Sequence, residues 1–299
     1  MSRTSTAGVL PEIFSPELTE LFSELNKLVG LSRVKEGLHQ LIQFVSVQKM
    51  RLSMGLKTDS LALHSVFFGN PGTGKTTVAR IYGKMLKALG LLSKGHLVET
   101  DISGLVAGFV GQTELKTDEK VKEALGGILF IDEAYSLYKG KDTQWDYGSD
   151  VISVLMKRME EHYDDFVVIV AGYYKPMAEF LLSNEPLERH FPTYLHFDDY
   201  SPQELVTIFE LFCREGDYEI NPAALELLRP TVEREYSRRD ESFGNARYVR
   251  NLFQSVVRNQ SVRIAETLKN PSQSDLVTIL PDDVRPLLVK KQEPVVSRY

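Results

Sequence analysis

A glycine-rich segment followed by a lysine and a threonine gives the sequence its clearest chemical signal. Residues 69–76, Gly-Asn-Pro-Gly-Thr-Gly-Lys-Thr, match the pattern G-x-x-x-x-G-K-[ST] and stand between an apolar run and a helical pattern. The glycines let backbone N–H groups wrap phosphate oxygens, and the start of a helix adds a favourable dipole. Lys75 is expected to reach the β- and γ-phosphates of a nucleotide, and the Thr76 hydroxyl to bind Mg²⁺. The expected phosphate-binding residues are Gly69, Asn70, Pro71, Gly72, Thr73, Gly74, Lys75, Thr76 and Thr77.

Two adjacent carboxylates end another apolar run, Gly-Ile-Leu-Phe-Ile. Asp132 is expected to hold the water shell of the Mg²⁺ ion, and Glu133 to polarise the water that attacks the γ-phosphate. An Asp-Glu pair after a strand is by itself often only the start of a loop. In one chain with Lys75 and Thr76, however, the pair indicates nucleotide hydrolysis rather than binding alone.

Apolar patterns around these motifs predict the elements that must position them. Short apolar runs alternate with segments whose apolar residues recur at helical spacing. Strands separated by helices predict a parallel sheet covered on both faces, and nearly continuous apolarity indicates central strands. The predicted fold class is therefore α/β. The expected strands are 64–69, 97–101, 128–132, 166–171 and 194–197.

A second, helical domain is predicted after about residue 199, where the strand pattern fades. Ser201-Pro202-Gln-Glu204 combines an N-cap serine, a first-turn proline and a capping-box glutamate. Apolar residues also recur at helical spacing from Pro16, within a segment that we assign as a tail. The predicted organisation is an N-terminal tail at 1–24, an α/β nucleotide-binding domain at 25–199, a small helical domain at 200–289 and a C-terminal tail at 290–299.

Composition excludes several classes of protein. The 299 residues are 42% hydrophobic and 25% charged, which is ordinary for a globular protein. No apolar stretch approaches the roughly 18 residues that cross a bilayer, and the N-terminus lacks the apolar core of a secretory signal. The single cysteine, Cys213, excludes an internal disulfide framework and fits a reducing, cytoplasmic setting. A formal net charge of −6 disfavours non-specific binding to nucleic acid.

Longer motifs resemble one group of nucleotide hydrolases. Residues 69–77, 126–137 (Gly-Gly-Ile-Leu-Phe-Ile-Asp-Glu-Ala-Tyr-Ser-Leu), 168–173 (Val-Ile-Val-Ala-Gly-Tyr) and 243–251 (Phe-Gly-Asn-Ala-Arg-Tyr-Val-Arg-Asn) are similar to the AAA+ ATPases of the CbbX/CfxQ/SpoVK group. That group includes red-type Rubisco activases and sporulation or secretion ATPases. The resemblance implies a five-stranded P-loop AAA+ domain, a helical lid domain, ATP and Mg²⁺ as cofactors, and a homo-oligomeric ring, usually a hexamer.

The resemblance also implies a pore loop within residues 103–113. In the group, an aromatic–aliphatic–glycine triplet grips a threaded peptide. The triplet here is Phe109, Val110 and Gly111, and the group commonly has Tyr where this chain has Phe109. An apolar pair between glycines suits an exposed loop poorly unless something contacts it. The alternative is that Phe109 is tucked into a core.

The resemblance also bears on the roles of two further positions. Arg247 matches the lid arginine, sensor 2, which reaches the γ-phosphate of its own subunit, and Arg250 is expected on the same helix face. A surface arginine without a role is the alternative for Arg247. After the fourth strand many AAA+ proteins carry a polar Asn or Thr, whereas this chain reads Ala-Gly-Tyr173, so the water-orienting role of Tyr173 stays open. We interpret Asp198-Asp199 as a solvated turn.

The chain departs from the group at the arginine that acts on a neighbouring subunit. The group typically has Asn-Pro-Gly-Leu-x-Ser-Arg-Phe, and this chain reads Asn-Glu-Pro-Leu-Glu-Arg-His-Phe at 184–191. An ungapped alignment puts His190 at the finger position and Arg189 one residue early. A guanidinium is always charged, whereas an imidazole is mostly neutral at pH 7. We expect a small loop shift to let Arg189 serve; the alternative is slow hydrolysis that depends on a partner or effector.

Three functions are compatible, to different degrees, with an ATP-hydrolysing domain of this kind. The leading hypothesis is an ATP-driven remodeller of a protein substrate, with Rubisco a possible client. A nucleotide-switched assembly scaffold that threads nothing is the second, because both need ATP-controlled oligomers. A DNA-directed AAA+ motor is disfavoured by the net charge of −6 and by the lack of a basic recognition helix.

Overall fold

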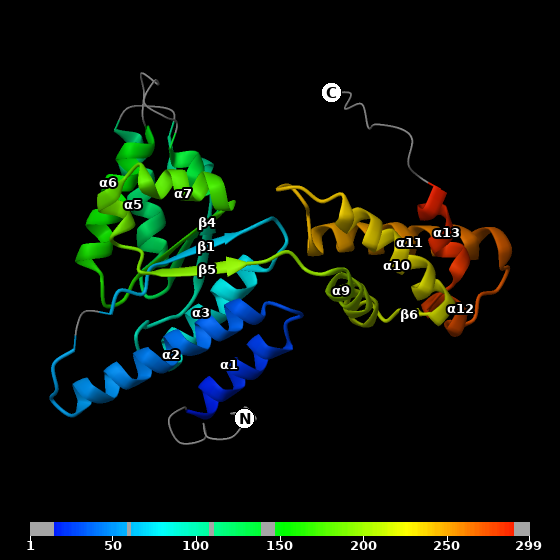
Figure 1. Ribbon diagram of the computed structural model, residues 1–299, viewed down its shortest axis with the longest axis horizontal. Coiled ribbons are helices and arrows are strands. Elements are labelled where there is room, and N and C mark those ends of the chain that lie inside the picture. The colour runs from blue at the N-terminus through cyan, green and yellow to red at the C-terminus, as the bar shows by residue number, and fades with distance from the viewer. Residues whose placement is uncertain (1–14, 59–60, 108–110, 139–146, 290–299) are drawn as a thin grey trace, which may run out of the picture. The chain divides into compact units, whose positions relative to one another are not determined.

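The chain divides into two units that are not contiguous in sequence. One, the α/β unit, comprises residues 1–69 and 74–197, and the other, the helical unit, comprises residues 70–73 and 198–299. The computed structural model describes residues 15–58, 61–107, 111–138 and 147–289 (Figure 1). The predicted boundary at 199/200 therefore lies two residues beyond the observed one, and four residues of the glycine-rich loop group with the C-terminal part of the chain.

Five parallel strands form the sheet of the α/β unit in the order β2-β3-β4-β1-β5. This confirms the predicted α/β class and all five predicted strands, with ends that shift by one residue at most. The first strand in the chain pairs with β4 on one side and with β5 on the other, so the residues that follow it leave from near the middle of the sheet. The strands are β1 (Ser65–Gly69), β2 (Leu97–Thr100), β3 (Ile128–Ile131), β4 (Val167–Gly172) and β5 (Thr193–Phe197).

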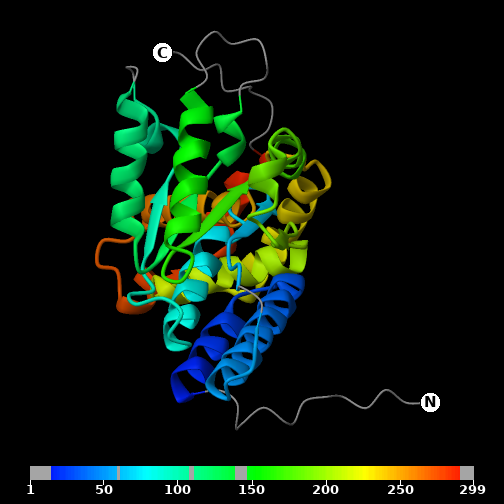
Figure 2. The ribbon, with the colours of Figure 1, turned by 90° about the vertical axis from the view of Figure 1, so that its left-hand side faces the viewer.

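Both faces of this sheet are covered, because successive side chains of each strand point to opposite sides. Phe67 packs into a core with helices α1, α2 and α3, whereas Val66 and Phe68 pack into a second core with helices of the other face. Figure 2 shows these two helical layers on either side of the sheet. The helices are α1 (Pro16–Lys27), α2 (Ser32–Ser53), α3 (Lys75–Ala88), α4 (Ile102–Leu105), α5 (Gln112–Ala124), η1 (Ala134–Leu137, a 3₁₀ turn), α6 (Tyr147–Glu161), α7 (Tyr174–Leu182) and α8 (Glu185–Glu188).

Helix α1 corrects the predicted N-terminal tail of residues 1–24. The helix begins at Pro16, and the Ser15 side chain caps it by accepting a hydrogen bond from the Leu18 N–H. Its apolar side chains are buried in the core shared with α2 and α3, so burial of a regular apolar face outweighs the polar composition around it. These buried residues are Leu18, Leu21, Phe22 and Leu25.

The helical unit contains two short strands as well as helices. Helix α9 starts at Pro202 with the predicted capping box, in which Ser201 and Glu204 satisfy each other's backbone N–H groups. Two short strands, β6 (Glu219–Ile220) and β7 (Thr278–Ile279), pair in parallel, a feature too short to leave a sequence pattern. The helices are α9 (Pro202–Glu215), α10 (Pro222–Ser237), α11 (Ala246–Thr267), α12 (Gln273–Val277) and α13 (Pro281–Val289).

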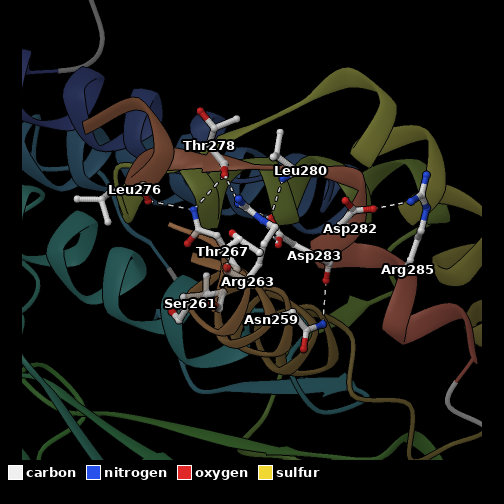
Figure 3. A network of polar contacts seen from close by, with 12 residues as sticks. Asn259, Ser261, Arg263, Thr267, Leu276, Thr278, Leu280, Asp282, Asp283 and Arg285 are labelled. Atoms are coloured by element: carbon white, nitrogen blue, oxygen red, sulfur yellow. Dashed lines mark hydrogen bonds and ion pairs between the residues drawn. The ribbon is translucent and has the colours of Figure 1, made fainter. Parts of the chain in front are cut away.

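A buried ion pair fastens the last elements of the chain to α11 (Figure 3). Asp283, which is fully buried, accepts from Arg263 Nε at 2.7 Å and from Arg263 Nη2 at 3.1 Å. The same carboxylate accepts the Leu280 N–H at 2.8 Å, and Asn259 Nδ2 donates to the Asp283 carbonyl at 2.8 Å. Both carboxylate oxygens of Asp283 thus have partners, which offsets the cost of burying the charge. None of the helices in the described residues is long and apolar enough to span a bilayer.

Candidate active site

The turn from β1 into α3 gives the predicted phosphate-binding residues their backbone form. Gly74 has a φ of 97°, a left-handed conformation that favours glycine, and α3 begins at the next residue, so its first N–H groups face the loop. The Lys75 ammonium donates a hydrogen bond of 2.8 Å to the Gly69 carbonyl, so the first residue of α3 contacts the last residue of β1. Thr76 is half-buried and Thr77 is exposed on the first turn of α3. The loop end, Lys75 and the helix start thus lie together at the carboxyl end of β1.

Carboxylates gather at the carboxyl edge of the sheet, next to Thr76. The Thr76 hydroxyl donates to Glu99 Oε1 at 3.2 Å, and the Asp132 N–H donates to the Thr100 carbonyl at 2.8 Å, which fixes the end of β3 against the end of β2. An open hollow of about 440 Å³ lies here; it is lined by Glu99, Thr100, Asp101, Gly104, Lys120 and Asp132. Sequence reasoning missed Glu99, because its place beside Thr76 depends on the strand order.

The donor set at this edge fits a magnesium nucleotide. A hydroxyl and carboxylates are the hard oxygen ligands that Mg²⁺ prefers, and Mg²⁺ commonly takes only one or two protein ligands beside waters and phosphates. In the described part of the chain, no group of three or more His, Cys, Asp or Glu is arranged to hold a metal by itself. Hydrogen bonds from the Ser103 hydroxyl and the Gly104 N–H lower the pKa of Asp101, which keeps one wall of the hollow anionic.

Glu133 directly follows Asp132 and turns out of the sheet. Its φ of 49° and ψ of 42° are left-handed, an unfavourable conformation for a residue with a side chain. Two hydrogen bonds hold this backbone: the Glu133 N–H donates to Asp132 Oδ1 at 3.1 Å, and the Glu133 carbonyl accepts the Ser136 N–H at 2.9 Å. The side chain is exposed.

Within the helical unit, residues 70–73 of the loop pack against the start of α11. A Cβ atom added to Gly72 would lie 2.3 Å from the Gly244 carbonyl oxygen and 2.8 Å from the Arg247 nitrogen, so this position requires glycine. The Ala246 N–H donates to the Gly72 carbonyl at 3.1 Å. The Tyr200 hydroxyl donates to the Thr73 carbonyl at 3.1 Å. The backbone at Arg247 thus adjoins the phosphate loop directly.

Asp199 corrects our interpretation of Asp198-Asp199 as a solvated turn. Its Oδ1 atom accepts from Asn70 Nδ2 at 2.9 Å and from Asn245 Nδ2 at 2.8 Å, and its Oδ2 atom lies 3.5 Å from Arg239 Nε. Asn245 is fully buried, and its φ of 47° is in the region that L-residues avoid. The contact with Asn70 joins positions 129 residues apart, which no local pattern could reveal.

The predicted arginines differ in their surroundings. Arg247 lies in the first turn of α11 with its side chain exposed, whereas the Arg250 guanidinium stacks over the Phe212 ring at 4.6 Å within the helical unit. Arg189 follows α8 and is 75% exposed, with its guanidinium paired to Glu185 on the preceding turn. His190 is only 21% exposed, and its Nδ1 atom lies 2.8 Å from the Pro186 carbonyl oxygen.

Of the predicted pore-loop triplet, Phe109 and Val110 lie outside the described residues. Gly111 precedes α5 with a φ of 80°, a conformation suited to glycine, and nothing lies within 4 Å of the position of a Cβ atom there. Tyr173, the open position after β4, is half-buried and its ring contacts that of Tyr135 at a centroid distance of 5.9 Å.

Comparison with known proteins identifies the two parts of the chain. Residues 65–191 match the ATPase family associated with various cellular activities (AAA), and residues 201–294 match the AAA lid domain. Stage V sporulation protein K of Bacillus subtilis is 39% identical over 89% of this chain and 82% of its own length. A chloroplastic ribulose bisphosphate carboxylase/oxygenase activase of Cyanidioschyzon merolae is 37% identical over 93% of this chain and 95% of its own.

Solved structures agree with this fold. The FIGL-1 AAA domain in complex with ADP superposes with a TM-score of 0.61 at 19% identity, covering 91% of this chain and 85% of that one. The Thermotoga maritima RuvB branch-migration motor gives a TM-score of 0.57 at 24% identity over 88% of this chain and 70% of that one. At such identities the likeness concerns the fold alone.

Proposed function

Because this chain belongs to the AAA+ ATPases of the CbbX/CfxQ/SpoVK group, we propose that it uses ATP hydrolysis to remodel a protein substrate or complex. The observation that carries the catalytic part is the group at the carboxyl edge of the sheet. Thr76 contacts Glu99 there, Asp132 lines the same hollow as Glu99, and Glu133 is exposed directly after Asp132. A nucleotide-binding module without hydrolysis would have no need for an exposed carboxylate held in a strained backbone.

Each side chain has a distinct part in the proposed reaction. Lys75 and the loop N–H groups bind the phosphates, and Thr76 with Asp132 holds Mg²⁺, which when bound neutralises charge on the phosphate oxygens. Glu133 orients the attacking water and accepts its proton. Arg247 is proposed to contact the γ-phosphate of its own subunit, and Arg189 that of a neighbour in a homo-oligomeric, hexameric ring.

Two substitutions test these assignments separately. Lys75→Ala should abolish binding of a fluorescent ATP analogue, because it removes a ground-state phosphate contact. Glu133→Gln should bind the analogue with wild-type affinity and hydrolyse ATP at least a hundredfold more slowly, because it removes the base, whose contribution is about 10²–10⁴-fold. Hydrolysis by Glu133→Gln at the wild-type rate would remove the catalytic assignment.

The protein client is the finer part of the proposal. Support comes from the relative named as a Rubisco activase and from the triplet Phe109, Val110 and Gly111, which we propose as the peptide-gripping pore loop. Rubisco is therefore one candidate client, and the single buried cysteine fits a reducing cytoplasm as the setting. The Glu133→Gln variant, loaded with ATP in native lysate, should retain the client for identification by mass spectrometry.

A scaffold that switches assembly with nucleotide is the second candidate. Phe109→Ala separates the two, because threading needs the aromatic grip and assembly does not. We expect the variant to keep its ATP-dependent increase in mass by light scattering while its remodelling activity collapses. Normal remodelling by Phe109→Ala would exclude threading through this loop, and retention of nothing but its own subunits by the Glu133→Gln trap would favour the scaffold.

A further inference from the structure

Glu133 has a fixed backbone but an exposed side chain, so something else must orient its carboxylate. The left-handed backbone is held by Asp132 and by the Ser136 N–H, as described above. Beyond the backbone, a glutamate has three rotatable bonds, and a misplaced catalytic group costs rate steeply. The residue that orients the carboxylate must therefore be rigid and must donate a hydrogen bond.

Tyr135 lies two residues further on, in the 3₁₀ turn η1, and its hydroxyl lies close to the Glu133 side chain. The ring is half-buried. Burial, with the nearby charge of Glu133 as a second cause, raises the pKa of Tyr135 to about 12. The hydroxyl therefore keeps its proton at neutral pH and can donate to the carboxylate.

The Tyr135 ring packs against Gly172 and Tyr173 at the end of β4, and we call this packing site its seat. A Cβ atom on Gly172 would lie 2.7 Å from Tyr135 Cδ1 and 2.9 Å from Tyr135 Cε1, so only glycine leaves room for the ring. The Tyr173 ring lies against the other tyrosine at 5.9 Å between centroids, with an angle of 49° between the planes. The ring thus has few positions open to it.

We propose that Tyr135 is a positioning residue that orients the Glu133 carboxylate toward the attacking water, and that the seat formed by Gly172 and Tyr173 fixes Tyr135. A carboxylate has two oxygens, so one can accept from Tyr135 while the other accepts from water. Tyr173, the residue after β4 whose role the sequence left open, then acts through Tyr135 rather than on water directly. The inference rests on the proposed role of Glu133 as the base.

Tyr135→Phe is the first test, because it removes the hydroxyl and keeps the ring in its seat. We expect kcat for ATP hydrolysis to fall about tenfold or more, the size expected for a misplaced catalytic group. KM for ATP, the affinity for the fluorescent analogue and the melting temperature should stay at wild-type values. Tyr138→Phe is the matched control: Tyr138 directly follows the same turn and is 42% exposed, and the variant should hydrolyse ATP at the wild-type rate.

A double-mutant cycle shows whether Tyr135 acts through Glu133. Single-turnover hydrolysis is measured for Tyr135→Phe, Glu133→Gln and the double variant, and the double variant should be no slower than Glu133→Gln alone. Gly172→Ala, which displaces the ring but leaves both side chains intact, should lower kcat with KM unchanged, like Tyr135→Phe.

Three results would overturn the inference: a kcat of Tyr135→Phe within twofold of wild type, a rise in its kcat, or an equal further loss in the Glu133→Gln background. An inactive Glu133→Gln with an unaffected Tyr135→Phe defeats only this inference. Wild-type hydrolysis by Glu133→Gln defeats the proposed function of Glu133 itself, and with it the need to position that side chain.

Discussion

The Asn245 side chain donates a hydrogen bond of 2.8 Å to the Asp199 carboxylate, between residues 46 positions apart. The same amide nitrogen lies within hydrogen-bonding distance of the Pro71 carbonyl, at 3.4 Å, and the Asn245 side-chain oxygen accepts the Tyr200 N–H at 2.9 Å. One buried side chain thus connects the phosphate loop, the start of the helical unit and the start of α11.

Asn245→Ala should therefore weaken ATP binding although Asn245 carries no charge. The substitution leaves the buried Tyr200 N–H without a partner and takes a donor from Asp199, at a cost of about 1–3 kcal/mol for each unsatisfied group. We expect a loss of about tenfold in ATP affinity together with a lower melting temperature. Asn251→Ala, an exposed asparagine on the same helix, is the control. Equal ATP affinity in the two variants would refute the role of the network.

The surroundings of Arg189 and His190 favour Arg189 as the finger that reaches the nucleotide of a neighbouring subunit. Arg189 is 75% exposed and paired only to an exposed glutamate, so its long side chain is available to a neighbouring subunit at little cost. His190 is turned inward against Pro186 and Glu160. Arg189→Ala should lower steady-state ATPase activity at least about tenfold without weakening ATP binding, given that arginine fingers contribute 10³–10⁵-fold. His190→Ala should do much less, and the reverse order would move the finger to His190.

The buried pair of Arg263 and Asp283 should dominate the stability of the helical unit. Asp283→Asn leaves a guanidinium that is only 18% exposed without its counter-charge, which costs about 3–5 kcal/mol. Thermal unfolding followed by circular dichroism should show the loss. Asp282→Asn is the neighbouring control, because Asp282 pairs with Arg285 on the surface and such pairs contribute about 0–1 kcal/mol. Similar melting temperatures for the two variants would contradict this account.

His64 should make the protein less stable in mild acid. Its Nδ1 atom accepts the Val168 N–H at 3.0 Å, and burial, with a smaller contribution from His190, lowers its pKa to about 4. The unfolded chain binds a proton on His64 near pH 6.5, but the folded protein does not, so the free energy of unfolding falls as pH drops from 6.5 toward 4, by about 3 kcal/mol in all.

Urea titrations of the wild type and of His64→Gln at several pH values measure this contribution. The glutamine retains an oxygen that can accept the Val168 N–H but does not titrate. The stability of the wild type should decline more steeply below pH 6.5 than that of the variant. Parallel curves would show that His64 is accessible to protons in the folded state.

How far the sequence predicts this protein depends on the range of the interactions. The strands and Lys75, Thr76, Asp132 and Glu133 follow from local apolar runs and from fixed spacing, and strand ends came within one residue. Glu99 could not be predicted because its place beside Thr76 depends on how α3, which follows β1, packs against β2. The roles of Asp199 and Asn245 could not be predicted because they have partners that lie 129 and 174 residues away. The role of Tyr135 could not be predicted because its ring packs against Gly172, which belongs to a strand further along the chain.

The grouping of residues 70–73 with residues 198–299 limits how relatives of this protein can be recombined. A chimera with one crossover at residue 198 would take Gly72 from one parent and Gly244 and Ala246 from another. These residues pack so closely that a Cβ atom at Gly72 would lie 2.3 Å from the Gly244 oxygen, which leaves little room for a mismatch. A functional exchange must therefore transplant the tetrapeptide 70–73 together with the C-terminal segment. The two stretches thus form one structural module, and a substitution in either is expected to need a matching change in the other.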